Sequence, residues 1–583
     1  MKKSLYFTLF VACIVSSLVL LEERQQHNNL ADGRILEANL LAALDLENKF
    51  ISTCGPINYN YFNYSVDAPI LEGLGSHSLT ITNSNERSQI YFDQGLNLTY
   101  GFNHTEAHRS FKQAAKISDK AAMAFWGQAY ALSPNINDSN INQKRRKEAL
   151  TAISSAIELL DGASKLEKEL INALNARFVI NDNGEIEVDN ESYMKKMVIV
   201  AEQFPDNPDV LTLYAASIMN TMPWDYWSKN LVPHMNTLRA KEALETAIAI
   251  NSKHPGAHHY YIHLTELPFP ERAAKSGDAL APLMPGAGHM VHMPSHAYIR
   301  VGRYFDAAVA NMKAIKADEG YISQCYSQGT YPLGYYPHNI HFLWYAATVM
   351  GDSKTAITAA KKTSEKVSTG QLSEMEYMQE FASIPIQAYV RFGHWNEILT
   401  IPYPGHNVKH MKLFWHYARG LAFVRKSLLG EAEEELDSLK KITEDKSYEN
   451  IFASINNSSD VATVAYHVLA GELFASKGNS EIAKDHFKEA ILKEDALKYT
   501  EPPSWHLPVR HNYGAFLLDQ GQFEEAENIY NEDLKIFWNN GWSLIGLHSS
   551  YLGQGNASKE KEIKTRFEES WQYADIKIER SVY

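Results

Sequence analysis

Cysteine is scarce in this chain, which excludes a scaffold held together by several disulfides. The 583 residues include three cysteines: Cys13 lies in an apolar N-terminal run, and Cys54 and Cys325 are far apart in the sequence. No CxxC pair or zinc-finger spacing occurs. A single disulfide between Cys54 and Cys325 is the most that the sequence allows.

Positive charge is also scarce, which argues against a nucleic-acid partner. The chain has 55 Lys and Arg against 69 Asp and Glu, a net charge of −14, and its longest basic run is residues 144–147. Phosphate binding needs a basic stripe. Signatures of several enzyme classes are missing too: there is no GxSxG, no P-loop, no GxGxxG after a strand and no HExxH.

Long apolar runs are missing except at the N-terminus. Lys2 and Lys3 precede the apolar residues 5–21, and charged residues follow. This layout is typical of a secretory signal peptide. The run is also at the short end for a membrane span, so an uncleaved anchor is the alternative. We therefore expect an exported protein, periplasmic or associated with the cell envelope, with no other contact with a membrane.

The rest of the chain has a helical pattern. Residues 22–83 are expected to form an irregular N-terminal cap, with a helical pattern over residues 30–50 and an extended stretch rich in Asn, Tyr, Gly and Pro over residues 51–81. From residue 84 onward, helical patterns of 12–16 residues alternate with short breaks, and no strand is convincing. The sequence therefore predicts an all-α fold.

Small and aromatic residues recur at fixed spacings in the helical part. A glycine is followed by an alanine 12 residues later and, in three of four cases, by an aromatic residue four further on. These sets are Gly95, Ala107 and Phe111; Gly471, Ala483 and Phe487; Gly514, Ala526 and Tyr530; and Gly420 and Ala432. We expect the small residues where two helices cross and the aromatic between neighbouring repeats.

This pattern resembles the tetratricopeptide repeat (TPR) family, whose unit is a 34-residue helix-turn-helix. The resemblance covers most of residues 84–583 and implies a TPR-like α-solenoid, a right-handed superhelix of antiparallel helix pairs. It divides the chain into irregular repeats (84–250), histidine-rich repeats (251–366) and C-terminal repeats (367–583).

The family resemblance also implies a function. A protein or peptide partner would lie in the concave groove, which the first helix of each repeat lines. The chain further resembles exported bacterial TPR proteins that are often encoded beside polysaccharide-utilisation machinery.

Histidines are concentrated in residues 254–341, which hold nine of the 23 in the chain. The repeat register, fixed by Gly and Ala, places eight polar residues of three consecutive repeats on groove-facing positions. They are His259, His263, Glu266, His289, His292, His296, His338 and His341. Tyr298 and Tyr345 are expected to be groove aromatics.

The spacing of these residues is suited to binding a metal ion. His259, His263 and Glu266 lie at i, i+4 and i+7, on one face of a helix. Two histidines and a carboxylate can bind Zn²⁺ with an open position or Fe²⁺ as a facial triad. The metal could activate a water for hydrolysis, with Glu106 or another carboxylate as the general base.

Other interpretations remain open. Any one of these histidines is more often a hydrogen-bonded packing residue than a ligand, and histidines with aromatics can also bind an acidic peptide or a sugar. Pro294 interrupts the helix between His292 and His296, so those two are not certain to share a face. His104 and His108 could join the site only if the array curled back.

The sequence therefore favours an exported TPR scaffold that binds a partner in its groove and has no certain cofactor. The alternative is a metal-dependent hydrolase or oxygenase that uses the groove histidines.

Overall fold

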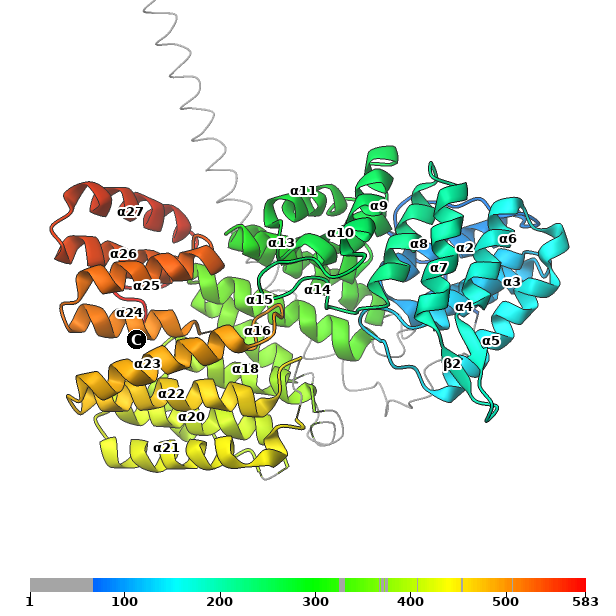
Figure 1. Ribbon diagram of the computed structural model, residues 1–583. Coiled ribbons are helices and arrows are strands. Elements are labelled where there is room, and N and C mark those ends of the chain that lie inside the picture. The colour runs from blue at the N-terminus through cyan, green and yellow to red at the C-terminus, as the bar shows by residue number, and fades with distance from the viewer. Residues whose placement is uncertain are drawn as a thin grey trace, which may run out of the picture. The chain divides into compact units, whose positions relative to one another are not determined.

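Antiparallel helix pairs follow one another along the chain, as the repeat pattern predicts (Figure 1). The computed structural model describes residues 67–583 except 324–330, 366, 368–371, 373–375, 406, 452–454 and 506. All of them belong to one compact unit, Asn60–Tyr583. The predicted signal peptide, the predicted helix at residues 30–50 and both Cys54 and Cys325 lie outside the described residues. None of the described helices is long and apolar enough to cross a membrane.

The first group of elements precedes the histidine-rich segment. It comprises α2 (Glu86–Tyr100), α3 (His104–Ile117), α4 (Ala122–Leu132), α5 (Gln143–Glu158), η2 (Leu160–Gly162), α6 (Lys165–Asn175), β1 (Phe178–Ile180), β2 (Ile186–Val188), α7 (Asn190–Gln203), α8 (Pro208–Met219) and α9 (Thr237–Ile250).

The second group carries the histidines. It comprises α10 (Pro255–Thr265), α11 (Pro270–Leu280), α12 (Gly288–His292), α13 (Pro294–Arg300), α14 (Tyr304–Ser323), the π-helical turn η3 (Tyr331–Tyr335), α15 (Tyr336–Met350) and α16 (Ser353–Glu365).

The third group ends the array. It comprises α18 (Met378–Arg391), α19 (Trp395–Thr400), α20 (Lys409–Arg425), α21 (Leu429–Glu444), η4 (Lys446–Tyr448), α22 (Ser458–Ser476), α23 (Ser480–Ala496), α24 (Val509–Asp519), α25 (Phe523–Ile536), α26 (Gly541–Gly553) and α27 (Ala557–Ser570).

A short β-hairpin between α6 and α7 corrects the expectation that the helical part has no strand. β1 and β2 pair antiparallel, with Phe178 opposite Val188. The turn between them has an Asn-Gly pair, and Gly184 has a φ of +77°, a backbone conformation that favours glycine. Three-residue strands leave almost no alternating pattern in the sequence, which is why the helical periodicity around them concealed the hairpin.

Aromatic rings fill the space beside the repeated glycines. Phe111, Phe487 and Tyr530 are fully buried. A Cβ atom added to Gly471 would lie 2.7 Å from the Phe487 ring. Tyr530 would meet such an atom both at Gly514 of its own repeat and at Gly546 of the next. One ring therefore packs against two helices of neighbouring repeats, and this fixes how closely those helices approach.

The early repeats pack against the histidine-rich ones. Helix α10 contacts α8, α9 and α11, and also α2 and α13. A single buried hydrophobic cluster extends from Ala68 to Met293. Because α2 reaches α10, the loop after α2 lies beside the histidines, where Phe102 packs against His259 at 4.3 Å between ring centroids.

Replacing Gly471 by alanine tests the close packing of the glycine and the aromatic ring. Because Phe487 is buried and cannot move away freely, we expect Gly471→Ala to lower the free energy of unfolding by about 1–3 kcal/mol. Gly430→Ala is the matched control, since Gly430 is an exposed helical glycine with open space around it. It should leave stability unchanged or raise it by up to about 1 kcal/mol. Urea unfolding followed by circular dichroism measures both; equal effects would contradict this account of the packing.

Candidate metal centre

Six histidines from four helices meet in the interior. α10 carries His259 and His263, α12 carries His289 and His292, α13 carries His296 and α15 carries His338. Five of them are at most 4% exposed, and His338 is half-buried. The sequence placed these residues on an open groove. The structure corrects this: most of them are enclosed between helices.

His292, His296 and His338 form one group within this interior, which we call the second triad. One ring atom from each lies within 4.8 Å of the others. Helix α12 ends at His292 and α13 begins at Pro294, but Met293 between them keeps helical dihedral angles (φ −50°, ψ −37°). The i, i+4 relation therefore survives the proline, and the Nε2 atoms of His292 and His296 lie 2.9 Å apart. The expectation that Pro294 could separate them is wrong.

Acceptor oxygens lie within about 3.1 Å of the outer nitrogen of two rings of the second triad. His292 Nδ1 lies 2.7 Å from Asn311 Oδ1, and the Asn311 amide nitrogen donates to the Ala307 carbonyl. Asn311 therefore presents its oxygen, so His292 Nδ1 carries the proton and its Nε2 presents a lone pair. His296 Nδ1 lies 3.1 Å from both Glu266 Oε2 and Glu501 Oε2. This arrangement of a histidine and an outer acceptor is typical of metal-binding histidines.

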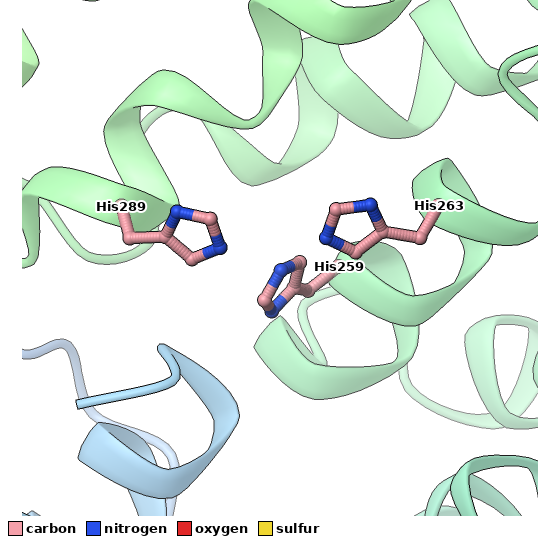
Figure 2. A group of neighbouring side chains, drawn as sticks. All are labelled: His259, His263 and His289. Carbon is pink, nitrogen blue, oxygen red and sulfur yellow. The ribbon is translucent and has the colours of Figure 1, made fainter. Parts of the chain in front are cut away.

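His259, His263 and His289 form the first triad (Figure 2), with one ring atom from each within 4.8 Å of the others. Figure 2 shows a nitrogen of each ring turned toward the space between them. His259 Nδ1 donates to the Tyr100 carbonyl at 2.5 Å, so its Nε2 presents a lone pair. Neither ring nitrogen of His263 or His289 has a hydrogen-bond partner among the described residues.

Burial is the main influence on the charge of five of these rings. It lowers the pKa of His259 and of His338 to about 3. It also lowers the pKa of His263, His289 and His292 well below the usual range. These rings are therefore neutral near pH 7, which is the form that binds metal ions.

His296 differs because it faces two carboxylates. Burial lowers its pKa, but the charges and hydrogen bonds of Glu266 and Glu501 outweigh burial and raise the pKa to about 9. Burial raises the pKa of Glu266 to about 7, against the lowering effect of His296. Without an ion, His296 is therefore protonated near neutral pH, and its Nε2 donates to His292.

The set of two histidines and a carboxylate predicted on one helix face is divided in the structure. Glu266 is the C-terminal cap of α10, and its Oε2 is 3.9 Å from His263 Nδ1 but 3.1 Å from His296 Nδ1. His259 instead faces His263 and His289. The carboxylate turns toward a different helix because α13 packs against α10 there.

Other predicted residues lie elsewhere. His341 stacks on Trp344 at 5.3 Å between ring centroids and is not in either triad. Tyr298 donates to Asp278 and lies under Arg303. Tyr345 is buried and lines a pocket beside the histidines. Glu106 accepts hydrogen bonds from Arg109 and Tyr321, which is not the position of a general base at the triads.

The array does curl back toward the histidines, but His104 stays outside the triads. Its ring stacks on Phe102 at 5.8 Å, and Phe102 in turn packs against His259, His263 and His289. Phe102 therefore forms an apolar wall of the first triad.

The residues that hold the histidines from outside are not marked in the sequence. Asn311 and Glu501 are single polar residues with no special spacing, and Glu501 is more than 200 positions along the chain from His296. The Tyr100 carbonyl is a backbone atom. Only tertiary packing brings these groups to the cluster, so no spacing in the sequence marks them.

A pocket of about 1000 Å³ opens beside the cluster. His263 and Glu266 line it from the cluster side, and Glu501 lines it from the C-terminal part of the chain. Aromatic and basic side chains form much of the remaining wall, among them Trp224, Tyr226, Trp227, Tyr345, Tyr499, Trp505, Arg300 and Arg510. A small molecule or a peptide segment in this pocket would lie next to the histidines.

A third polar group, His77, Asp209 and His254, is structural. His254 caps α10, and its Nδ1 accepts from the Ala257 backbone N–H at 3.0 Å. The ring proton is therefore on Nε2, which donates to Asp209 at 3.2 Å. Both ring nitrogens of His254 are therefore engaged in hydrogen bonds, and neither is free to bind a metal ion.

Comparison with known proteins gives no family assignment. No family model and no curated protein matches the chain. Among solved structures, it is similar to a human IFIT1 dimer with m7Gppp-AAAA, at 12% identity over 78% of this chain and 91% of that one, with a TM-score of 0.32. Naa15/Naa10 bound to HypK-THB is 13% identical over 83% and 71%, with a TM-score of 0.21. Cut9–Hcn1 of the APC/C is 11% identical over 84% and 95%, with a TM-score of 0.27.

Buried neutral histidines should make the protein sensitive to acid, and His410 isolates the effect. Burial lowers the pKa of His410 to about 3. Its ring nitrogen Nδ1 is hydrogen-bonded to the Ser458 hydroxyl, and His410 is far from the triads in the sequence. Below about pH 6.5 the unfolded chain takes up a proton that the folded chain does not, so stability is full above that pH and is lost as the pH falls toward 3.

We expect His410→Gln to remove this contribution. Between pH 7.5 and 5, the variant should lose about 2 kcal/mol less unfolding free energy than the unsubstituted protein. Urea unfolding at the two pH values measures the difference. An equal loss in both proteins would mean that His410 is protonated in the folded chain.

Proposed function

We propose that this TPR-like helical-repeat protein binds a transition-metal ion at the second triad, His292, His296 and His338. The observation that carries the proposal is the pair of Nε2 atoms 2.9 Å apart, each on a ring whose Nδ1 faces an acceptor oxygen. Such rings present two lone pairs to the same point, where an ion can replace the single proton that bridges them.

The third ring and the nearby charges favour an ion over that proton. His338 also converges on this point, and its ring centroid is 4.9 Å from that of His292. A proton is shared by two nitrogens, whereas an ion can use all three. Glu266 and Glu501, whose side chains are 2% and 3% exposed, place negative charge behind His296. This charge offsets part of the cost of burying a cation.

The ligand set indicates which ions fit. Neutral imidazoles suit Zn²⁺, copper and Fe²⁺, whereas Mg²⁺ and Ca²⁺ need oxygen ligands. Nitrogens about 2.0–2.1 Å from one ion lie roughly 3–4 Å apart, so rings whose ring atoms are within 4.8 Å need only small rotations. Zn²⁺ and Fe²⁺, the two ions that the spacing of the histidines suggests, are both compatible with this ligand set.

A second candidate function is partner binding, which the TPR resemblance implies. The pocket with its aromatic and basic wall supports it, because such a wall can hold a peptide segment or another small ligand beside the ion. Export and an accessory role in polysaccharide utilisation stay predictions from the sequence.

Metal analysis of the untagged full-length protein tests the proposed site. After loading with Zn²⁺ and desalting, we expect the second triad to retain one equivalent and the protein's Tm to rise. Asn311→Leu should weaken Zn²⁺ binding there by about 10–100-fold, because His292 loses the group that orients it.

His410→Gln is the matched control, a buried histidine outside the triads, and should bind Zn²⁺ like the unsubstituted protein. The proposal fails if Zn²⁺ neither remains bound nor changes the Tm, or if Asn311→Leu and His410→Gln bind it equally well.

A further inference from the structure

We infer that a second metal ion binds at the first triad, His259, His263 and His289, so that the histidine cluster is a two-ion centre. The inference rests on the proposed function, which assigns the first ion to His292, His296 and His338. Each triad is a complete set of three imidazoles, and no histidine belongs to both.

One ring of the first triad has the outer support that two rings of the second triad have. The Tyr100 carbonyl holds His259 Nδ1, which leaves Nε2 turned inward. His263 and His289 have no hydrogen-bond partner at either nitrogen among the described residues. A buried polar atom without a partner costs about 1–3 kcal/mol, and an ion in the triad would give one nitrogen of each of these two rings a partner.

The contrast with His77, Asp209 and His254 shows that this is more than crowding of histidines. That group also has ring and carboxylate atoms within 4.8 Å of one another, yet hydrogen bonds use both nitrogens of His254. In the first triad, Glu266 Oε2 is 3.9 Å from His263 Nδ1, beyond hydrogen-bond distance, and both ring nitrogens of His289 lack a hydrogen-bond partner among the described residues. The triad's nearest apolar neighbour, Phe102, cannot accept a conventional hydrogen bond.

The two triads are neighbours that share the same helices. His289 and His292 lie one turn apart on α12, with ring centroids 5.7 Å apart. His263 on α10 and His296 on α13 have centroids 5.4 Å apart. Glu266 lies between these last two rings and is the group placed to link the sites, since its Oε2 is 3.1 Å from His296 Nδ1 and 3.9 Å from His263 Nδ1.

Three neutral imidazoles define the class of the second ion. The set suits borderline or soft ions such as Zn²⁺ and Cu⁺, and it does not suit Mg²⁺ or Ca²⁺. His263 also lines the pocket, so a molecule in the pocket would lie beside one ligand of this ion.

Counting bound Zn²⁺ in the untagged full-length protein tests the inference without any substitution. Equilibrium dialysis followed by elemental analysis should give two tightly bound equivalents. His289→Ala and His292→Ala should each retain one, the double variant none, and His410→Gln two. Circular dichroism shows which variants are folded. If a variant is unfolded, the number of Zn²⁺ ions bound by the unsubstituted protein decides the inference.

The outcomes separate the two claims. One equivalent that is lost in His292→Ala and kept in His289→Ala would overturn the second ion and leave the proposed function standing. One equivalent that is lost in His289→Ala and kept in His292→Ala would overturn the site assigned under the proposed function. No bound Zn²⁺ would overturn both, and two equivalents that neither variant loses would place the ions elsewhere.

Discussion

The histidine cluster depends on one constraint: six imidazole rings are enclosed between helices, and most of their polar nitrogens are shielded from water. A buried ring nitrogen needs a partner, and in half of these rings an acceptor oxygen lies beside the outer nitrogen. Tyr100, Asn311 and Glu266 with Glu501 hold the outer nitrogens of three rings. The inner nitrogens face one another. These outer contacts orient the three rings inward, and the ring nitrogens that face one another make the cluster suited to binding cations.

The packing of the repeats creates the enclosure. Glycines beside buried aromatics let successive helices approach closely, and the array brings α2 against α10. The loop after α2 then supplies both the Tyr100 carbonyl and the Phe102 wall. Glu501 comes from the segment between α23 and α24 and lies 3.1 Å from His296 Nδ1. A repeat fold in which each unit touches only its neighbours would not join such distant segments, so the curl of this array is what completes the site.

The sequence predicted the fold well because its signals are local. Gly471, Ala483 and Phe487 encode a helix crossing within 17 residues, and the same spacing recurs. The repeat register also singled out these histidines, but it placed them on a groove, whereas the structure encloses most of them between helices. Their partners were not predicted: Glu266 faces His296 on another helix, Met293 carries the helix through to Pro294, and Asn311 and Glu501 act only through tertiary contacts. Spacing along one helix cannot show which helix packs against it.

X-ray absorption spectroscopy of the Zn²⁺-loaded protein tests the central claim most directly, because it reports the ligands themselves. The two-triad arrangement predicts an inner shell of mostly nitrogen at about 2.0–2.1 Å, with outer-shell scattering from about three imidazoles per ion. An inner shell of mostly oxygen, with no imidazole pattern, would contradict it.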